Sequence, residues 1–267
     1  MNKKESEMLL LLKQLRDECG AVSVKAEFEA EGTRVDELLR LADLARKADL
    51  KIALKVGGCE AIRDLLDCQQ FGAEYVIAPM VETPYALQKF IDAKNKVFSE
   101  EQKKYTEFLF NVETICAFEN INEILSLASQ KDGLDGAVFG RVDFAGSLNE
   151  SRDIINSERL NNYIFETARL CKKNNLDLVV GGAVSIESIR ALQDIHQIHL
   201  NRFETRKVIF ESNVLQSKNL IAGLEKTIYF ELLWLQNKKD YYDEIRNEDK
   251  KRILMLQSRW EQVNKKG

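Results

Sequence analysis

Apolar and polar residues alternate along most of the chain with two different periods. Seven stretches rich in β-branched and aromatic residues predict strands, at residues 21–29, 51–56, 75–81, 106–114, 136–141, 176–184 and 202–210. Between them, apolar residues recur at three- and four-residue spacing, which predicts helices over residues 35–48, 60–70, 84–97, 121–129, 158–173 and 186–196. Strands that alternate with helices are typical of parallel β-α-β units. We therefore predict an α/β fold, with helices around a (β/α) TIM-type barrel or on both faces of an open sheet.

The two ends of the chain lack this alternation. Residues 6–19 read as a helix with no strand before it, and residues 213–236 and 241–263 read as two long C-terminal helices. We expect a barrel domain over residues 1–212 and a helical extension over residues 213–267. The extension is mildly basic and bears aromatic residues, which favours oligomerisation or packing on its own barrel. Acidic residues interrupt each of its basic clusters, which disfavours membrane-surface or nucleic-acid binding.

Composition agrees with a folded enzyme-sized chain and removes several classes of function. The 267 residues are 45% apolar and 31% charged, unlike an intrinsically disordered chain. The formal net charge of −4 does not favour a polyanionic partner. The cysteines are odd in number and form no C-x-x-C pair, so we expect a reducing, cytoplasmic setting. No uncharged stretch approaches the ~18 residues of a membrane span, and no membrane role is expected.

Several predicted strands carry charged residues near their carboxyl ends. Lys25, Glu27 and Glu29 share one side of the first strand, and Lys55 ends the second. Active sites of parallel α/β folds lie at this end of the strands. The sequence therefore predicts a polar site at the carboxyl-terminal mouth of the barrel.

Two acids lie one β-α unit apart, Glu113 after the fourth predicted strand and Asp143 after the fifth. Neighbouring strand ends would bring the two carboxylates together, and carboxylate oxygens with open positions for water and substrate suit Mg²⁺ or Mn²⁺. The alternative is structural: Glu113 pairs with a Lys or Arg inside the barrel, and Asp143 caps a turn.

The segments around these acids resemble the HpcH/HpaI aldolase and citrate lyase β-subunit family. The similarity extends over about residues 7–210 and is carried by APMVET at 78–83, ET at 113–114, FEN at 118–120, EI at 123–124, GLDG at 133–136 and GRVDF at 140–144. The resemblance implies a (β/α) barrel with a divalent metal on the two acids matching Glu113 and Asp143. It further implies that the metal is chelated by a 2-oxo acid or its enolate, next to which a carbon–carbon bond is formed or broken.

The sequence departs from the family pattern at three points. Lys55 occupies the place where the family usually has an arginine, which keeps the charge but loses the bidentate fork. The aldolase histidine expected after the first strand is absent, so Glu29, Glu27 or Lys25 would have to move the proton, unless these three only form salt bridges. The first strand of the family also has no counterpart, so the barrel either closes with seven strands or is completed by another segment or a partner subunit.

Backbone and side-chain groups for binding the substrate follow two of the strands. The backbone N–H groups of Gly140, Arg141 and Val142 are candidates for a carboxylate, and those after Gly182 are candidates for a phosphate or carboxylate, with a tight capped turn as the alternative. Arg206 is expected either to bind a substrate anion or to pair with Glu204 inside the barrel.

The leading hypothesis is a metal-dependent carbon–carbon lyase or aldolase that acts on a pyruvate-like 2-oxo acid and an aldehyde or acyl thioester. Its catalytic candidates are Lys55, Glu29 and Arg206, Lys25 is a substrate-binding candidate, and Mg²⁺ or Mn²⁺ is the expected cofactor. A Schiff-base aldolase using a neutral Lys25 or Lys55 is a second possibility. The non-enzymatic alternative is a degenerate barrel that serves in binding or assembly. A homo-oligomer is expected.

Overall fold

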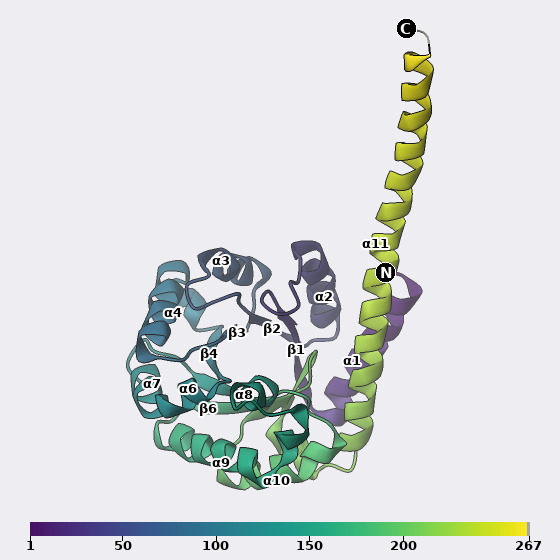
Figure 1. Ribbon diagram of the computed structural model, residues 1–267. Coiled ribbons are helices and arrows are strands. Elements are labelled where there is room, and N and C mark those ends of the chain that lie inside the picture. The colour runs from purple at the N-terminus through teal and green to yellow at the C-terminus, as the bar shows by residue number, and fades with distance from the viewer. Residues whose placement is uncertain (266–267) are drawn as a thin grey trace.

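A closed eight-stranded barrel forms the centre of the computed structural model, which describes residues 1–265 (Figure 1). Strands β1 to β7 run parallel to their neighbours, except that β7 pairs antiparallel with β8, and β8 also pairs antiparallel with β1. The strands are β1 (Ala21–Glu27), β2 (Lys51–Lys55), β3 (Tyr75–Ala78), β4 (Glu107–Val112), β5 (Gly136–Gly140), β6 (Asp177–Gly181), β7 (Arg202–Glu204) and β8 (Val208–Glu211).

The eighth strand corrects the expected strand count. The single strand predicted over residues 202–210 is a hairpin, because the chain reverses at the polar residues 205–207. The turn is held by Thr205, whose N–H donates to the Val208 carbonyl at 2.9 Å. Strand β8 then fills the gap beside β1, so the barrel closes within one chain and needs neither seven-strand closure nor a partner subunit.

Helices surround the barrel and cover its outer face (Figure 1). Their positions follow the predicted amphipathic segments, with additional short helices in the loops. They are α1 (Lys3–Cys19), α2 (Val35–Lys47), α3 (Ile62–Phe71), α4 (Pro84–Val97), α5 (Glu100–Lys103), α6 (Ile115–Glu119), α7 (Ile121–Ala128), α8 (Arg141–Ser147), η1 (Arg152–Asn156), α9 (Glu158–Lys173), η2 (Ile186–Ser188), α10 (Ile189–Ile198), η3 (Ser212–Gln216) and α11 (Leu220–Asn264).

Period-two alternation divides the strand side chains between the helices and the barrel interior. The interior holds a buried apolar layer made of Ala53, Tyr75, Ile77, Leu109, Val138, Val179 and Ile209. Below it, at the amino-terminal ends of the strands, the Arg202 guanidinium donates to Glu107 at 2.7 Å and to Asp177 at 2.8 Å. These two layers close the floor of the barrel, so only the carboxyl-terminal end is open to a ligand.

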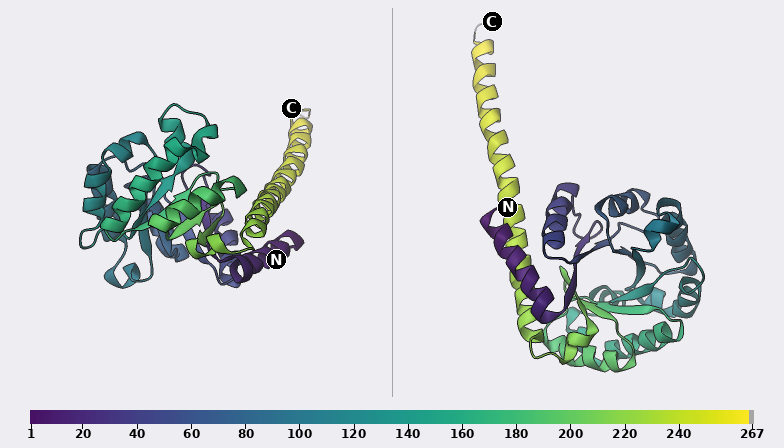
Figure 2. Two further views of the ribbon diagram at one scale, coloured as in Figure 1. Left: turned by 90° about the horizontal axis from the view of Figure 1, so that it is seen from below. Right: turned by 180° about the vertical axis from the view of Figure 1, so that it is seen from behind.

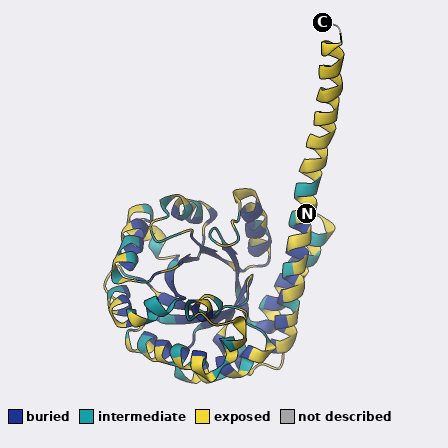
Figure 3. Ribbon diagram, viewed as in Figure 1, coloured by how far each residue is buried: buried dark blue, intermediate teal, exposed yellow. Residues whose placement is uncertain are grey.

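The C-terminal region is one 45-residue helix, α11, and the prediction of two helices is wrong. Residues 237–240 contain neither Gly nor Pro, so nothing in the local sequence stops helical hydrogen bonding there. The first half of α11 packs beside α1, burying Phe230, Leu233 and Trp234, and the second half projects away from the barrel (Figures 2 and 3). Each helix of residues 1–265 is too short or too polar to cross a membrane.

Candidate functional site

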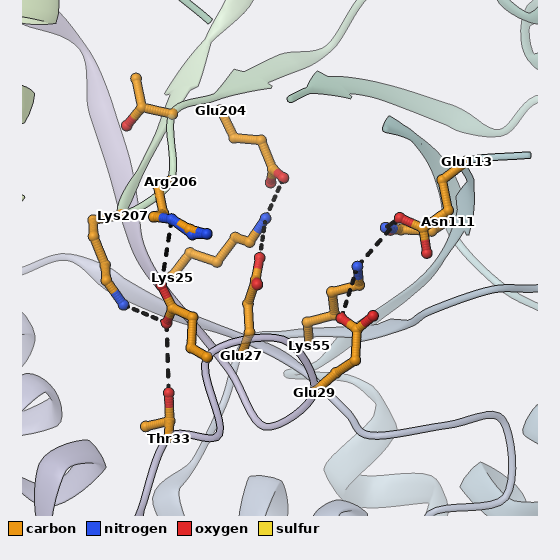
Figure 4. Close-up of polar contacts among 12 residues, drawn as sticks. Lys25, Glu27, Glu29, Thr33, Lys55, Asn111, Glu113, Glu204, Arg206 and Lys207 are labelled. Atoms are coloured by element: carbon orange, nitrogen blue, oxygen red, sulfur yellow. Dashed lines mark hydrogen bonds and ion pairs between the residues drawn. The ribbon is translucent and has the colours of Figure 1, made fainter. Parts of the chain in front are cut away.

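A cavity of about 490 Å³ opens at the carboxyl-terminal ends of the strands. Most of its lining comes from strand ends and the loops that follow them, and α11 adds Thr227, Ile228 and Glu231. The sequence places polar residues here because the last inward-facing position of several strands is charged. Two groups of ionised side chains project into this space (Figure 4).

The first group is centred on Lys55 at the end of β2. Its ammonium lies 2.9 Å from Glu29 Oε2 and 3.2 Å from Glu113 Oε2. Glu113 also accepts hydrogen bonds from the side-chain amide of Asn111 at 2.6 Å and from the Met80 backbone N–H at 2.8 Å. Burial alone would lower the pKa of Lys55, but the charges of Glu113 and Glu29 outweigh it and raise that pKa.

The second group is centred on Lys25 in β1. Its ammonium pairs with Glu27 at 3.1 Å and with the buried Glu204 of β7. Burial again acts to lower the pKa of the lysine, and the two carboxylates reverse the effect and raise it above its usual value. Burial also acts to raise the pKa of Glu27, but the charge of Lys25 prevails and holds it below the usual range. Both lysines are therefore ammonium ions in the free protein.

These ion pairs argue against the Schiff-base hypothesis, because a nucleophilic lysine must be neutral. Treatment with sodium borohydride in the presence of pyruvate is expected to leave the mass of the chain unchanged, since Lys25 and Lys55 each lie between two carboxylates. Mass spectrometry of the intact chain, with an incubation lacking pyruvate as the control, measures this. A pyruvate adduct mapped to Lys25 or Lys55 would contradict the expectation.

Glycines at two strand ends make room for the carboxylates. A Cβ on Gly140 would lie 2.9 Å from Glu113 Cβ, and one on Gly181 would lie 2.7 Å from Glu204 Oε1. Gly182 has a φ of +83°, and a Cβ there would lie 2.8 Å from the backbone nitrogens of Arg141 and Val142. These three positions exclude a side chain, and Gly182 packs directly against the turn that begins α8.

Asp143 lies in the first turn of α8, with an exposed side chain at the edge of the cavity. Partial burial raises its pKa, and the negative charge of Glu113 raises it further, whereas Lys55 acts in the opposite direction. The negative charge of Glu113 therefore opposes ionisation of the Asp143 carboxyl group. A divalent cation between carboxylates would relieve that repulsion.

No group of three or more His, Cys, Asp or Glu side chains among residues 1–265 is arranged to hold a metal ion, so a cation here would take most of its ligands from water and substrate. Asn111 Oδ1 and Glu204 Oε2 are buried acceptors without a hydrogen-bond partner in the described part of the chain. The ionisable groups lining the cavity are six carboxylates and four cations, namely Glu27, Glu29, Glu113, Asp143, Glu204 and Glu231 with Lys25, Lys55, Arg152 and Arg206. Oxygen donors with an excess of negative charge are what Mg²⁺ and Mn²⁺ require. If a cation binds to Glu113, the Lys55 ammonium must release Glu113 Oε2 and pair with Glu29 alone.

The two candidate arginines, Arg141 and Arg206, differ in where their side chains lie. The Arg141 side chain is 1% exposed and points away from the cavity, donating to the Gly181 carbonyl at 3.1 Å, to Asn156 Oδ1 at 3.1 Å and to Ser188 Oγ at 3.2 Å. Only its backbone is placed to bind a substrate. Arg206 lies at the cavity rim and faces two acids other than Glu204, since its Nε is 3.9 Å from Glu31 and 3.7 Å from Glu231.

Some residues in or near the cavity were not singled out by the sequence. Arg152 lines the cavity from η1, outside any strand. The Met80 backbone N–H donates to Glu113, and the φ of Met80 is +50°, but the resemblance at residues 78–83 does not indicate this role. Lys207 belongs to the charged run of residues 204–207 but was not named as a candidate. It lies next to Arg206 in the turn of the hairpin, and its ammonium binds Glu31.

The chain matches the model of one protein family, the HpcH/HpaI aldolase/citrate lyase family, over residues 20–209. Among solved structures, that of an HpcH/HpaI aldolase/citrate lyase family protein from Burkholderia cenocepacia J2315 is similar, with a TM-score of 0.62 at 12% identity, and the match covers 91% of this chain and 90% of that one. The citrate synthase SbnG gives a TM-score of 0.60 at 16% identity, with 88% and 90% covered.

An HpcH/HpaI aldolase from Desulfitobacterium hafniense DCB-2 gives a TM-score of 0.58 at 12% identity, with 73% of this chain and 81% of that one covered. At these identities the three structures establish a shared fold. A search of the curated proteins finds no match.

Proposed function

The chain belongs to the HpcH/HpaI aldolase/citrate lyase family, and on that basis we propose that it is a metal-dependent carbon–carbon lyase or aldolase whose donor is a pyruvate-like 2-oxo acid. Membership in this family identifies the chain as an enzyme of the aldolase and citrate lyase type. The metal, the donor and the residues that act on them are the proposal. The observation that carries it is the convergence of Glu113, Asp143 and the unpaired Asn111 Oδ1 beside Lys55 in one cavity.

Glu113 and Asp143 are the proposed ligands of Mg²⁺ or Mn²⁺. When bound, the ion would act as a Lewis acid that stabilises negative charge on the donor oxygen by several kcal/mol. Asn111 holds the Glu113 carboxylate through its side-chain amide, which fixes the orientation of this ligand.

The donor carboxylate needs a site with N–H donors and positive charge. The backbone N–H groups that follow Gly140 lie at the cavity edge, held in place by the close packing of Gly182 on Arg141 and Val142. Lys55, which keeps its ion pair with Glu29, supplies a positive charge on the other side. Arg206, at the rim, would bind an anionic group of the second substrate, an aldehyde or an acyl thioester.

Glu29 is the proposed proton acceptor. Its Oε2 atom makes no hydrogen bond within the described residues and is held only by the Lys55 ammonium. A carboxylate so placed can take a proton from the carbon next to the donor carbonyl. The two histidines lie outside the cavity, where His199 Nε2 contacts the Leu176 carbonyl at 2.8 Å, near the amino-terminal end of β6.

Hydrogen exchange tests the proposal without knowledge of the acceptor. In D₂O with Mg²⁺ or Mn²⁺, the protein is expected to exchange the methyl protons of pyruvate for deuterium, and removal of the metal with EDTA should abolish the exchange, as measured by proton NMR. Exchange that persists at the same rate in EDTA would contradict metal dependence. Calorimetry with oxalate, a planar mimic of the enolate, should show binding only in the presence of metal.

A second candidate, a degenerate barrel retained for binding or assembly, is favoured by one observation. Lys55, Asn111 and Met80 already occupy both oxygens of Glu113. If neither metal nor metal with oxalate binds, this second candidate is correct.

We also propose that the protein is cytoplasmic, because its five cysteines are free thiols.

A further inference from the structure

The projecting half of α11 exposes an apolar surface with a regular repeat. All side chains of residues 244–264 are exposed, including Ile253, Leu256 and Trp260 at 54%, 56% and 67% (Figure 3). Large apolar residues of this kind seldom face water along a whole helix unless a partner covers them.

The repeat continues through the first half of α11, on the side away from its buried residues. From Ile228 onward, alternating four- and three-residue steps define a stripe that consists of Ile228, Leu232, Leu235, Lys239, Tyr242, Arg246, Asp249, Ile253, Leu256, Trp260 and Val263. Such spacing is the a/d pattern of a coiled coil. Ile228, Leu232 and Leu235 in this stripe are 70%, 49% and 53% exposed. The stripe is therefore apolar at both ends and charged in the middle.

We propose that α11 pairs antiparallel with α11 of a second copy of this chain, about a two-fold axis near residue 244. In this register Lys239 of each copy faces Asp249 of the other as an opposite-charge pair, and Tyr242 faces Arg246. Outside these central layers apolar residues meet apolar residues, except at the two ends, where Val263 faces Glu225. The outer layers pair Leu235 with Ile253, Leu232 with Leu256 and Ile228 with Trp260.

Other arrangements of the same stripe create unfavourable contacts, either between like charges or between charged and apolar residues. A parallel pair sets Lys239, Arg246 and Asp249 each against its own copy, which buries three like-charge contacts. An antiparallel pair shifted by one heptad sets Asp249 against Leu232 and Arg246 against Leu235, and the opposite shift sets Lys239 against Leu256. Charge complementarity thus selects one partner orientation and one register.

The stripe is exposed on both sides of Tyr242, whereas Tyr242 itself is half-buried against α2, with the Arg34 guanidinium 5.0 Å from its ring centroid. The overlap covers about 39 residues, roughly 60 Å of helix. Tyr242 at its centre donates to Glu37 of α2 at 2.8 Å, which anchors α11 to the barrel at that level. Ile228 also lines the catalytic cavity, so the register places Trp260 of the second copy beside the cavity mouth.

Sedimentation equilibrium of the full chain tests the pairing. The parent chain should be a dimer, and Asp249→Lys should weaken dimerisation at least about tenfold, because it sets two lysines against each other. Lys239→Asp should have the same effect, and the double variant should restore the dimer by exchanging the charges. Glu248→Lys makes the same charge change on the outer face of the helix and should leave dimerisation unchanged. A monomeric parent, or a dimer indifferent to Asp249→Lys, would overturn the proposal.

Disulfide trapping tests the register separately. In the proposed pair Ile245 lies next to Ile245 of the second copy, so Ile245→Cys should cross-link under mild oxidation. Asp249→Cys should not cross-link, because position 249 faces Lys239. The parent chain, which contains the five native cysteines, is the background control. Preferential cross-linking of Asp249→Cys would show a parallel pair and overturn the proposed arrangement.

Discussion

Replacement of Glu113 by Gln is expected to lower the rate of metal-dependent pyruvate proton exchange by about 10³-fold or more. The substitution removes one of two proposed ligand charges, and loss of Lewis-acid stabilisation of about 4 kcal/mol corresponds to that factor. The shape of the side chain is retained, and a Gln oxygen can still accept from Met80, now 2.8 Å from Glu113. The barrel should therefore fold, and the loss should lie in the exchange rate and in metal affinity.

Glu60→Gln provides the matched control for this experiment. Glu60 follows β2 at the same end of the barrel, but it lies outside the cavity and pairs with Lys89 at 2.7 Å. Its replacement should change the exchange rate by less than about threefold, as expected for an exposed ion pair. If Glu113→Gln exchanges protons and binds Mn²⁺ as well as the parent chain does, Glu113 is not a metal ligand and the proposed chemistry fails.

The barrel itself was predictable because strand and helix periods leave clear signatures. Inward and outward residues of β2 and β4 alternate as the pattern predicted, and the polar strand ends at Lys25 and Lys55 indicated which end would be open. The family resemblance agreed with that architecture. The strands, the helices and the polar strand ends can be predicted because each produces a local pattern of apolar and polar residues in the sequence.

The closure of the barrel was not predictable in the same way. Residues 202–210 have a continuous strand-like pattern, and only the polar triplet 205–207 hints at a reversal. The antiparallel pairing of β8 with β1 joins segments about 185 residues apart, so it depends on tertiary contacts. The sequence pattern predicts two helices in place of α11 because residues 237–240 are polar. These residues include no helix breaker, so the helix continues through them.

The candidate site was predictable in composition and only partly in geometry. The sequence placed Glu113, Asp143, Lys55 and Glu29 at the barrel mouth, and the structure lines one cavity with all four. Which cation pairs with which carboxylate depends on side-chain reach across the barrel, which strand order alone does not fix. Arg206 was expected either to bind a substrate anion or to pair with Glu204, and the hairpin turn directs it to the cavity rim, toward Glu31 and Glu231.

Replacement of Arg141 by Ala is expected to destabilise the protein by about 3 kcal/mol. The buried guanidinium ties the start of α8 to the Gly181 carbonyl and to Asn156 and Ser188, and truncation would remove these hydrogen bonds and leave a void. An opposing effect reduces the loss, because burial lowers the pKa of Arg141 to about 10 and thus penalises the charged form. Arg141→Met, which fills the space without a charge, should therefore cost less, about 2 kcal/mol.

Urea denaturation of the variants measures these costs, with Arg159→Ala as the matched control. Arg159 lies on α9 with a side chain 58% exposed and pairs with Glu150 at 2.7 Å, so its removal should change the free energy of unfolding by less than about 0.5 kcal/mol. Metal and oxalate affinity should stay within about threefold of the parent in folded Arg141→Met, since this side chain points away from the cavity. An Arg141→Ala variant of unchanged stability that has lost oxalate binding would show that the guanidinium acts in substrate binding and would contradict its structural role.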